Sequence, residues 1–124
     1  MKHLINWVEI PALDIERAKK FYSKILGGIR FTDYPMPDTK DKYSLFPSED
    51  AFNAGALVQS PNHKPCADGV VVYFDGGKDM DNILREVENA GGQIIMPKTF
   101  TGTDAGHIGM FIDSEGNKIG LQHP

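Results

Sequence analysis

Glu9 is the residue of this chain that best suits acid–base chemistry, and Trp7 stands two positions before it. Residues two apart in a strand point to the same face, so the carboxylate and the indole would share one surface. In a partly dry cleft the charged form of such a carboxylate is disfavoured, which suits a general acid or base. The alternative is that Glu9 pairs with a lysine or arginine, or simply faces water.

The histidines are the next candidates for chemistry: His3, His63, His107 and His123. No two of them show the i, i+4 spacing of a helical metal pair, and scattered histidines are more often surface or hydrogen-bonded residues, so we expect no metal site. His107 stands out because it follows the glycine-containing loop 101–106. It is a candidate ligand contact at the mouth of a cleft, with a structural role beside the turn as the alternative.

Two further features have plain interpretations. Cys66 lies in the polar segment HKPCADG and is interpreted as incidental rather than as a nucleophile; a single cysteine forms no internal disulfide. The tract 98–109 contains three glycines and three threonines. It lacks the Gly-Lys-Ser/Thr ending and the following helix of a phosphate-binding loop, so it is expected to be a lid or an ordinary loop.

The predicted secondary-structure elements that must position these side chains occur twice along the sequence, in the same order. Each copy has a strand, an amphipathic helix that ends at a Gly-Gly pair, and further strands; the pairs begin at Gly27 and Gly91, 64 residues apart. Asp14 suits the cap of the first helix and Asp79 begins the second. Strands are expected near 3–10, 29–33, 42–46 and 54–59, and again near 69–74, 93–96, 107–112 and 118–122.

This pattern predicts an α+β fold. It consists of two tandem βαβββ modules, about 1–60 and 69–124, within one domain spanning 1–124, and their strands form a curved mixed sheet around a cleft. Segment 60–69, with its two prolines, is the expected link. The turn 113–117 (DSEGN) is a strong hairpin signal because Gly116 and Asn117 accept positive φ.

Strand alternation predicts which side chains line the cleft. If Val8, Ile10 and Ala12 face the first helix, then Trp7 and Glu9 face the cleft.

Charge and composition exclude several functions. The net charge of −4 offers no basic stripe for nucleic acid, and no window approaches the ~20 apolar residues that span a bilayer. The beginning MKHLINWVEI lacks the pattern of a secretory signal. We therefore expect a cytoplasmic protein that binds neither nucleic acid nor membrane.

The sequence resembles the vicinal oxygen chelate superfamily, which includes glyoxalase I, the bleomycin-resistance proteins and the extradiol dioxygenases. The matching segments are 10–22 (IPALDIERAKKFY) with Leu26-Gly27, similar to the family's first strand and Phe-Tyr helix, and 111–121 (FIDSEGNKIGL), similar to its final hairpin. The resemblance covers nearly the whole chain and implies the two-module fold. It also makes a homodimer the default.

In that superfamily a divalent metal is usually held by His and Glu side chains from equivalent strands of the two modules. Alignment on Asp14 places Trp7 at the first ligand position, while the last strand places Gly120 at the usual Glu. The second module offers Val70 or Val72. The fourth position falls within 55–59, at Leu57 or Gln59. Since at most one neutral amide remains, we expect no metal and no cofactor.

Three functions remain open. The first is a metal-independent small-molecule binding protein of the resistance type, with ligand contacts expected from Trp7, Glu9, Gln59, Val72, His107 and Gly120. Trp7 would stack on a planar ligand or fill the space of the missing metal. The second is a glyoxalase-like lyase, isomerase or dioxygenase that acts through Glu9 or a displaced metal site. The third is an accessory module with a protein partner. The sequence does not identify a ligand.

Overall fold

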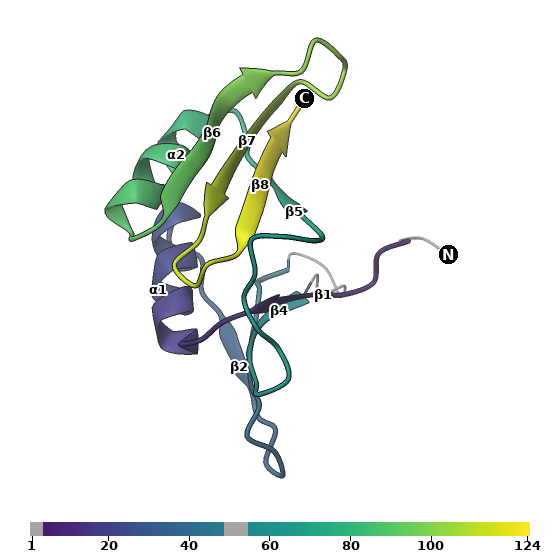
Figure 1. Cartoon of the computed structure of the whole chain (residues 1–124), viewed down its shortest axis with the longest axis vertical. Coiled ribbons are helices and arrows are strands. Elements are labelled where there is room, and N and C mark those ends of the chain that lie inside the picture. The colour runs from purple at the N-terminus through teal and green to yellow at the C-terminus, as the bar shows by residue number, and fades with distance from the viewer. Residues whose placement is uncertain (1–3, 49–54) are drawn as a thin grey trace.

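The computed structural model describes residues 4–48 and 55–124, and it contains two modules that lie one above the other along the long axis of the molecule (Figure 1). The helices α1 (Ile15–Ile25) and α2 (Met80–Asn89) contact each other and lie on the same side of the molecule. The α+β class and the two tandem βαβββ modules are therefore confirmed. The strands form two separate four-stranded sheets, which do not close on each other.

The first module has strand order β1-β4-β3-β2. The edge strand β1 runs parallel to β4, and the other neighbours are antiparallel. Its elements are β1 Val8–Pro11, α1 Ile15–Ile25, β2 Thr32–Tyr34, β3 Lys42–Leu45 and β4 Gly55–Gln59. The second module repeats this arrangement with order β5-β8-β7-β6 and elements β5 Val72–Asp75, α2 Met80–Asn89, β6 Gln93–Phe100, β7 His107–Ile112 and β8 Lys118–His123.

Both helices begin and end as the sequence predicts. The Asp14 carboxylate accepts a hydrogen bond from the Arg17 amide, and the Asp79 carboxylate accepts one from the Asn82 amide, so each acid satisfies a free first-turn donor. After α1 the backbone turns at Gly27 with φ of 73°, a conformation that glycine adopts without steric cost.

One hydrophobic core serves both modules. Its buried cluster contains Phe21 and Tyr22 of α1 together with Phe111 and Leu121 of the second module. The rings of Phe46 and Phe74 lie 5.5 Å apart and join the two sheets on their helix side. Because these aromatic side chains come from both halves of the chain, the two modules stabilise each other.

A buried polar network reinforces this contact. In the turn that precedes β8, the Asp113 carboxylate accepts hydrogen bonds from the Tyr22 hydroxyl and from its own turn. The Glu115 carboxylate, which has no exposed surface, pairs with Arg17 at 2.7 Å and accepts the amide of Asp14 at 2.8 Å. The turn of the second module thus holds the N-terminal end of α1 in the first.

Several predicted boundaries shift. The expected first strand 3–10 begins only at Val8 among the described residues, and the expected strand 93–96 extends to Phe100. The expected strand at 29–33 becomes 32–34, and the strand at 69–74 becomes 72–75. His3 lies outside the described residues.

Candidate functional site

The face of the first sheet that points away from α1 carries the predicted carboxylate. Ile10 and Leu57 are paired neighbours, and both belong to the buried core. Glu9, one residue earlier, therefore points to the opposite face, as predicted. Register continues this row across all four strands through Glu9, Ala56, Leu45 and Thr32.

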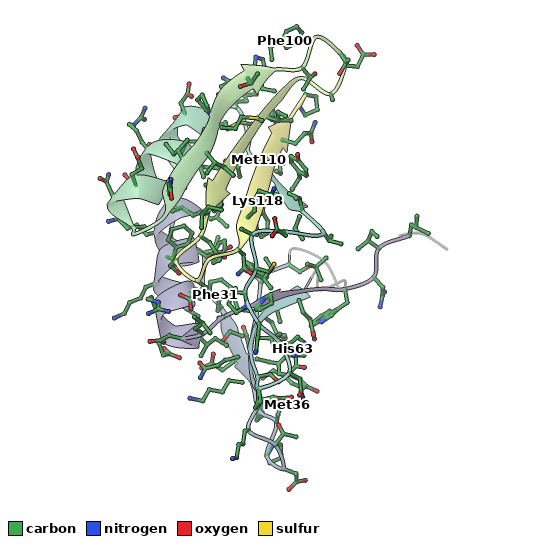
Figure 2. The ribbon with its side chains drawn as sticks, in the orientation of Figure 1. Phe31, Met36, His63, Phe100, Met110 and Lys118 are labelled. Atoms are coloured by element: carbon green, nitrogen blue, oxygen red, sulfur yellow. The ribbon has the colours of Figure 1, made fainter. Side chains whose placement is uncertain are left out.

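The second sheet has a matching row. Phe74 and Leu121 pair on the core side, so their neighbours Tyr73 and Gly120 pair on the other face. The row then continues to Met110 and Met96. Figure 2 labels Met110 on this sheet and His63 beside the strands of the first module.

Hydrogen bonds fix how the two rows correspond. The Ala12 amide donates to the Val58 carbonyl at 2.8 Å, just after β1, and the Gly76 amide donates to the Gln122 carbonyl at 2.9 Å, just after β5. If these two bonds are superimposed, Glu9 corresponds to Tyr73 and Ala56 to Gly120. Two residues earlier, Trp7 corresponds to Val71.

This correspondence corrects two assignments of family ligand positions. The family ligand position on the first strand of the second module is Val71, which corresponds to Trp7. It is not Val72, which pairs with the buried Ile119, and it is not Val70, which stands one residue before Val71. The fourth position is Ala56, not Leu57 or Gln59. Leu57 faces the core, and the Gln59 amide oxygen accepts a hydrogen bond from the Ile15 amide at 2.8 Å.

A metal of the family's kind does not fit the side chains at these four positions. Trp7, Ala56, Val71 and Gly120 offer an indole, a methyl group, an isopropyl group and a hydrogen atom, and none of these donates a lone pair to a cation. Within 4–48 and 55–124, no group of three or more His, Cys, Asp or Glu side chains is arranged to hold a metal ion.

Space at Gly120 leads to the same conclusion. A Cβ atom built at this glycine would lie 2.4 Å from Cδ2 and 2.5 Å from Cε2 of Tyr73, so the tyrosine ring lies directly against the glycine. A carboxylate side chain at this position would require the ring to leave. The ring of Tyr73 thus lies over the position where the family usually has a glutamate, and Tyr73 is still 44% exposed.

Glu9 has neighbours that the sequence did not reveal. One carboxylate oxygen accepts the indole N–H of Trp7 at 3.2 Å, and the other lies 3.0 Å from Nε2 of His63. His63 belongs to the link after β4, where its amide donates to the Ser60 carbonyl. Glu9 therefore pairs with a histidine, whereas the alternative interpretation of its role expected a lysine or an arginine.

Tyr43 adds a fourth side chain to this cluster. Burial raises the pKa of the Tyr43 hydroxyl, and the negative charge of Glu9 raises it further. Tyr43 lies on β3 two residues from Leu45 and so belongs to the same face as Glu9. We call Trp7, Glu9, Tyr43 and His63 the Glu9 cluster.

The remaining predicted contacts are dispersed. Val72 lines a hollow of about 730 Å³ near the edge strands β1 and β5, together with Val8, Phe46 and Phe74. The ring of His107 lies 5.3 Å from that of Phe100, whose label marks the far end of the second sheet in Figure 2.

The structure therefore brings Trp7 and Glu9 together and leaves Gly120 on the other sheet. Gln59 binds α1 through its side chain. Sequence reasoning missed Tyr73, Tyr43 and His63. The residue paired with Gly120 could have been found only from the register of β5.

The arrangement offers two surfaces to a ligand. The first combines the Glu9 carboxylate with aromatic side chains, and the second combines a tyrosine ring with two methionines. Both suit a flat, partly apolar molecule with a few polar groups.

Among the described residues, no helix has the length and hydropathy needed to cross a membrane.

Comparison with known proteins gives a consistent result. The sequence model of the Glyoxalase/Bleomycin resistance protein/Dioxygenase superfamily matches residues 4–121. "Putative glyoxylase CFP32" of Mycobacterium tuberculosis and Mycobacterium bovis is 28% identical over 116 residues, which cover 94% of this chain and 44% of that protein. The chain thus spans about half the length of the curated relatives it matches.

Two solved structures share the fold. A glyoxalase/bleomycin resistance protein from Albidiferax ferrireducens superimposes with a TM-score of 0.71 at 23% identity, covering 98% of this chain and 99% of that one. TnmS3, an antibiotic binding protein from Streptomyces sp. CB03234, superimposes with a TM-score of 0.61 at 23% identity, covering 100% of this chain and 97% of that one.

Proposed function

Because the chain belongs to the Glyoxalase/Bleomycin resistance protein/Dioxygenase superfamily, we propose that it is a small-molecule binding protein that works without a metal ion or cofactor. The observation that carries this proposal is the Tyr73 ring that lies against Gly120. This ring takes the space that a metal-binding glutamate side chain would need at position 120. The outer face of the second sheet is therefore suited to contact with a flat molecule and not to coordination of a metal ion.

The ligand would be bound between aromatic side chains. Trp7 is 39% exposed and Tyr73 is 44% exposed, and each lies on the face of its sheet that points away from the helices. Stacking on such rings adds to the binding free energy that the ligand gains from burial of its apolar area. The likeness to an antibiotic binding protein supports a ligand of drug size.

A homodimer would complete the cleft. Trp7 immediately precedes β1 and Tyr73 lies on β5, so the two rings lie at different sheets of one chain, and those sheets do not close on each other. The edge strands β1 and β5 also leave one side unpaired within the described residues. A second copy whose second module faces the first module of its partner would bring an indole and a tyrosine ring together.

The experiment combines metal analysis with ligand titration. We expect purified protein to contain less than about one tenth of an equivalent of Ni, Zn, Fe or Mn, and planar compounds to quench Trp7 fluorescence equally before and after treatment with EDTA. Trp7 is the chain's single tryptophan, so the signal reports on this site. Stoichiometric metal that is lost together with binding would refute the proposal.

The second candidate is an enzyme, a glyoxalase-like lyase, isomerase or dioxygenase that acts through Glu9 or a displaced metal site. The hydrogen bond between Glu9 and His63 favours it, since such a pair transfers protons readily. The name of the mycobacterial relatives points to the same chemistry. A Glu9→Gln variant with unchanged turnover would remove Glu9 from this candidate.

We further propose that the protein acts in the cytoplasm and binds neither nucleic acid nor membrane. The net charge of −4 and the lone Cys66 support this. Cell fractionation tests the location directly.

A further inference from the structure

Resting on the proposed binding function, we propose that the ligand is a planar organic cation whose positive charge lies at the carboxylate of Glu9. The reason is that the charge of this carboxylate has no fixed counter-charge in the cluster.

The donors that surround Glu9 are neutral groups. The indole of Trp7 donates at 3.2 Å and carries no charge, and the Tyr43 hydroxyl carries none either. Among residues 4–48 and 55–124, no lysine or arginine forms an ion pair with Glu9. The Glu9 side chain is 28% exposed, and its partners in the cluster include no lysine or arginine.

His63 pairs with Glu9 at 3.0 Å, but an imidazole is not a permanent cation as the side chain of a lysine or an arginine is. Its Nε2 faces Glu9, so the Nε2–H tautomer makes the hydrogen bond and leaves a lone pair on Nδ1. Within the described part of the chain, Nδ1 of His63 is the buried side-chain atom that has no hydrogen-bond partner. The pair therefore contains no permanent cation, and a cationic ligand would supply one.

The other lysines and arginines of the described segments form no ion pair with Glu9. Lys40 and Lys64 line the same hollow as His63 but form no ion pair with Glu9. Lys118 is on β8, two residues from Gly120, and so lies on the second sheet. The positive part of the ligand would accordingly lie over the first sheet.

The aromatic side chains add a second attraction for a cation. Trp7 and Tyr43 flank Glu9, and a cation over an aromatic face is attracted by the negative potential of the ring. The raised pKa of the Tyr43 hydroxyl has burial as its main cause, with the negative charge of Glu9 as the next contribution. A planar cation would meet a carboxylate and a ring at the same place, whereas a planar anion would meet repulsion.

Three tricyclic probes of matched shape test the inference: proflavine, a cation; acridone, which is neutral; and anthraquinone-2-sulfonate, an anion. Binding is followed by Trp7 fluorescence and checked by calorimetry on wild type, Glu9→Gln and Glu88→Gln. Glu88 is an exposed residue of α2, so its variant removes the same charge away from the site.

We expect wild type to bind proflavine most tightly and the sulfonate most weakly. Glu9→Gln should weaken proflavine binding about tenfold and leave acridone affinity unchanged, since only the cation loses an opposite charge in a partly dry site. Glu88→Gln should leave all three affinities within about twofold, because exposed charges at a distance are screened.

Two results overturn the inference separately from the proposed function. If the three probes bind equally, or if Glu9→Gln binds proflavine as tightly as wild type does, the planar site stands and its preference for a cation is wrong. If neither fluorescence nor calorimetry detects any of the three probes, the planar-ligand function fails as well. Because the Glu9→Gln substitution could disturb the fold, circular dichroism of the variant and its unchanged acridone affinity serve as the check.

Discussion

The Tyr22 hydroxyl donates a hydrogen bond to Asp113 at 2.6 Å, and this contact is one of those that join the helix of the first module to the last turn of the second. Both residues are buried, and the same carboxylate oxygen also accepts the Asn117 side-chain amide at 3.0 Å. Burial, followed by the charge of Asp113, raises the pKa of Tyr22 well above the ordinary tyrosine value, so the phenol stays protonated and remains a donor.

Tyr22→Phe should therefore lower the free energy of unfolding by about 1–3 kcal/mol, since it leaves a buried carboxylate with one donor fewer. Urea denaturation measures this difference. Tyr34→Phe is the matched control because the Tyr34 side chain is exposed, and it should change stability by less than about 0.5 kcal/mol. Equal effects of the two variants would show that the buried contact contributes nothing specific.

The Glu115 carboxylate should make the free energy of unfolding depend on pH. Burial alone would raise its pKa, but hydrogen bonds from Arg17, the Asp14 amide and Ser114 lower the pKa overall. A folded pKa below the unfolded one adds stability above the unfolded pKa, and this stability is lost as the pH falls through the folded pKa. The contribution should thus be complete above about pH 5 and decline below about pH 4.

Glu115→Gln isolates this contribution. At pH 7 the variant should be about 2 kcal/mol less stable than wild type, because Arg17 loses its charged partner. The difference between the two proteins should shrink as urea titrations move below about pH 4. Other acids with lowered pKa values, such as Asp33 and Asp75, are present in both proteins and cancel in the difference. A difference that does not vary with pH would contradict the assignment.

The contact between Tyr73 and Gly120 predicts a coupled pair of substitutions. Gly120→Ala should cost about 1–2 kcal/mol, because the new Cβ displaces the Tyr73 ring. In a Tyr73→Ala background the same change should cost much less, since the clashing atoms are gone. A double-mutant cycle of unfolding free energies measures the coupling. Additive effects would mean that the ring does not rest on the glycine in solution.

The sequence predicted the helices accurately because local signals define them. Each helix has an aspartate that satisfies first-turn amides, an apolar stripe and a closing glycine pair, and all of these lie within one segment. The turn 113–117 was likewise predicted as a hairpin. Its second role was not, because Asp113 and Glu115 bind partners about a hundred residues earlier in the chain.

The site was predicted only in part because strand register is not a local property. Val70, Val71 and Val72 form an apolar run with no alternation, so the face of each could not be read, and an error of one residue exchanges the two faces. Strand β1 alternates clearly, and there the faces of Glu9 and Ile10 were predicted correctly. His63 was assigned to the link, and no spacing indicated that this link reaches back to β1.

The last prediction concerns the proposed pairing of two chains in a homodimer. If a second copy completes the cleft, apolar side chains beside the edge strand β5 should be covered in the dimer, and Val70 is 93% exposed in the single chain. Val70→Asp should then weaken the dimer, because burying a carboxylate at an apolar contact is unfavourable. Phe100→Asp is the control, since Phe100 is also exposed but lies on β6, the opposite edge of the second sheet. Sedimentation equilibrium should give about twice 13.7 kDa for wild type and Phe100→Asp, and a lower mass for Val70→Asp. A monomeric wild type that still binds planar ligands would place the cleft within one chain and refute the shared site.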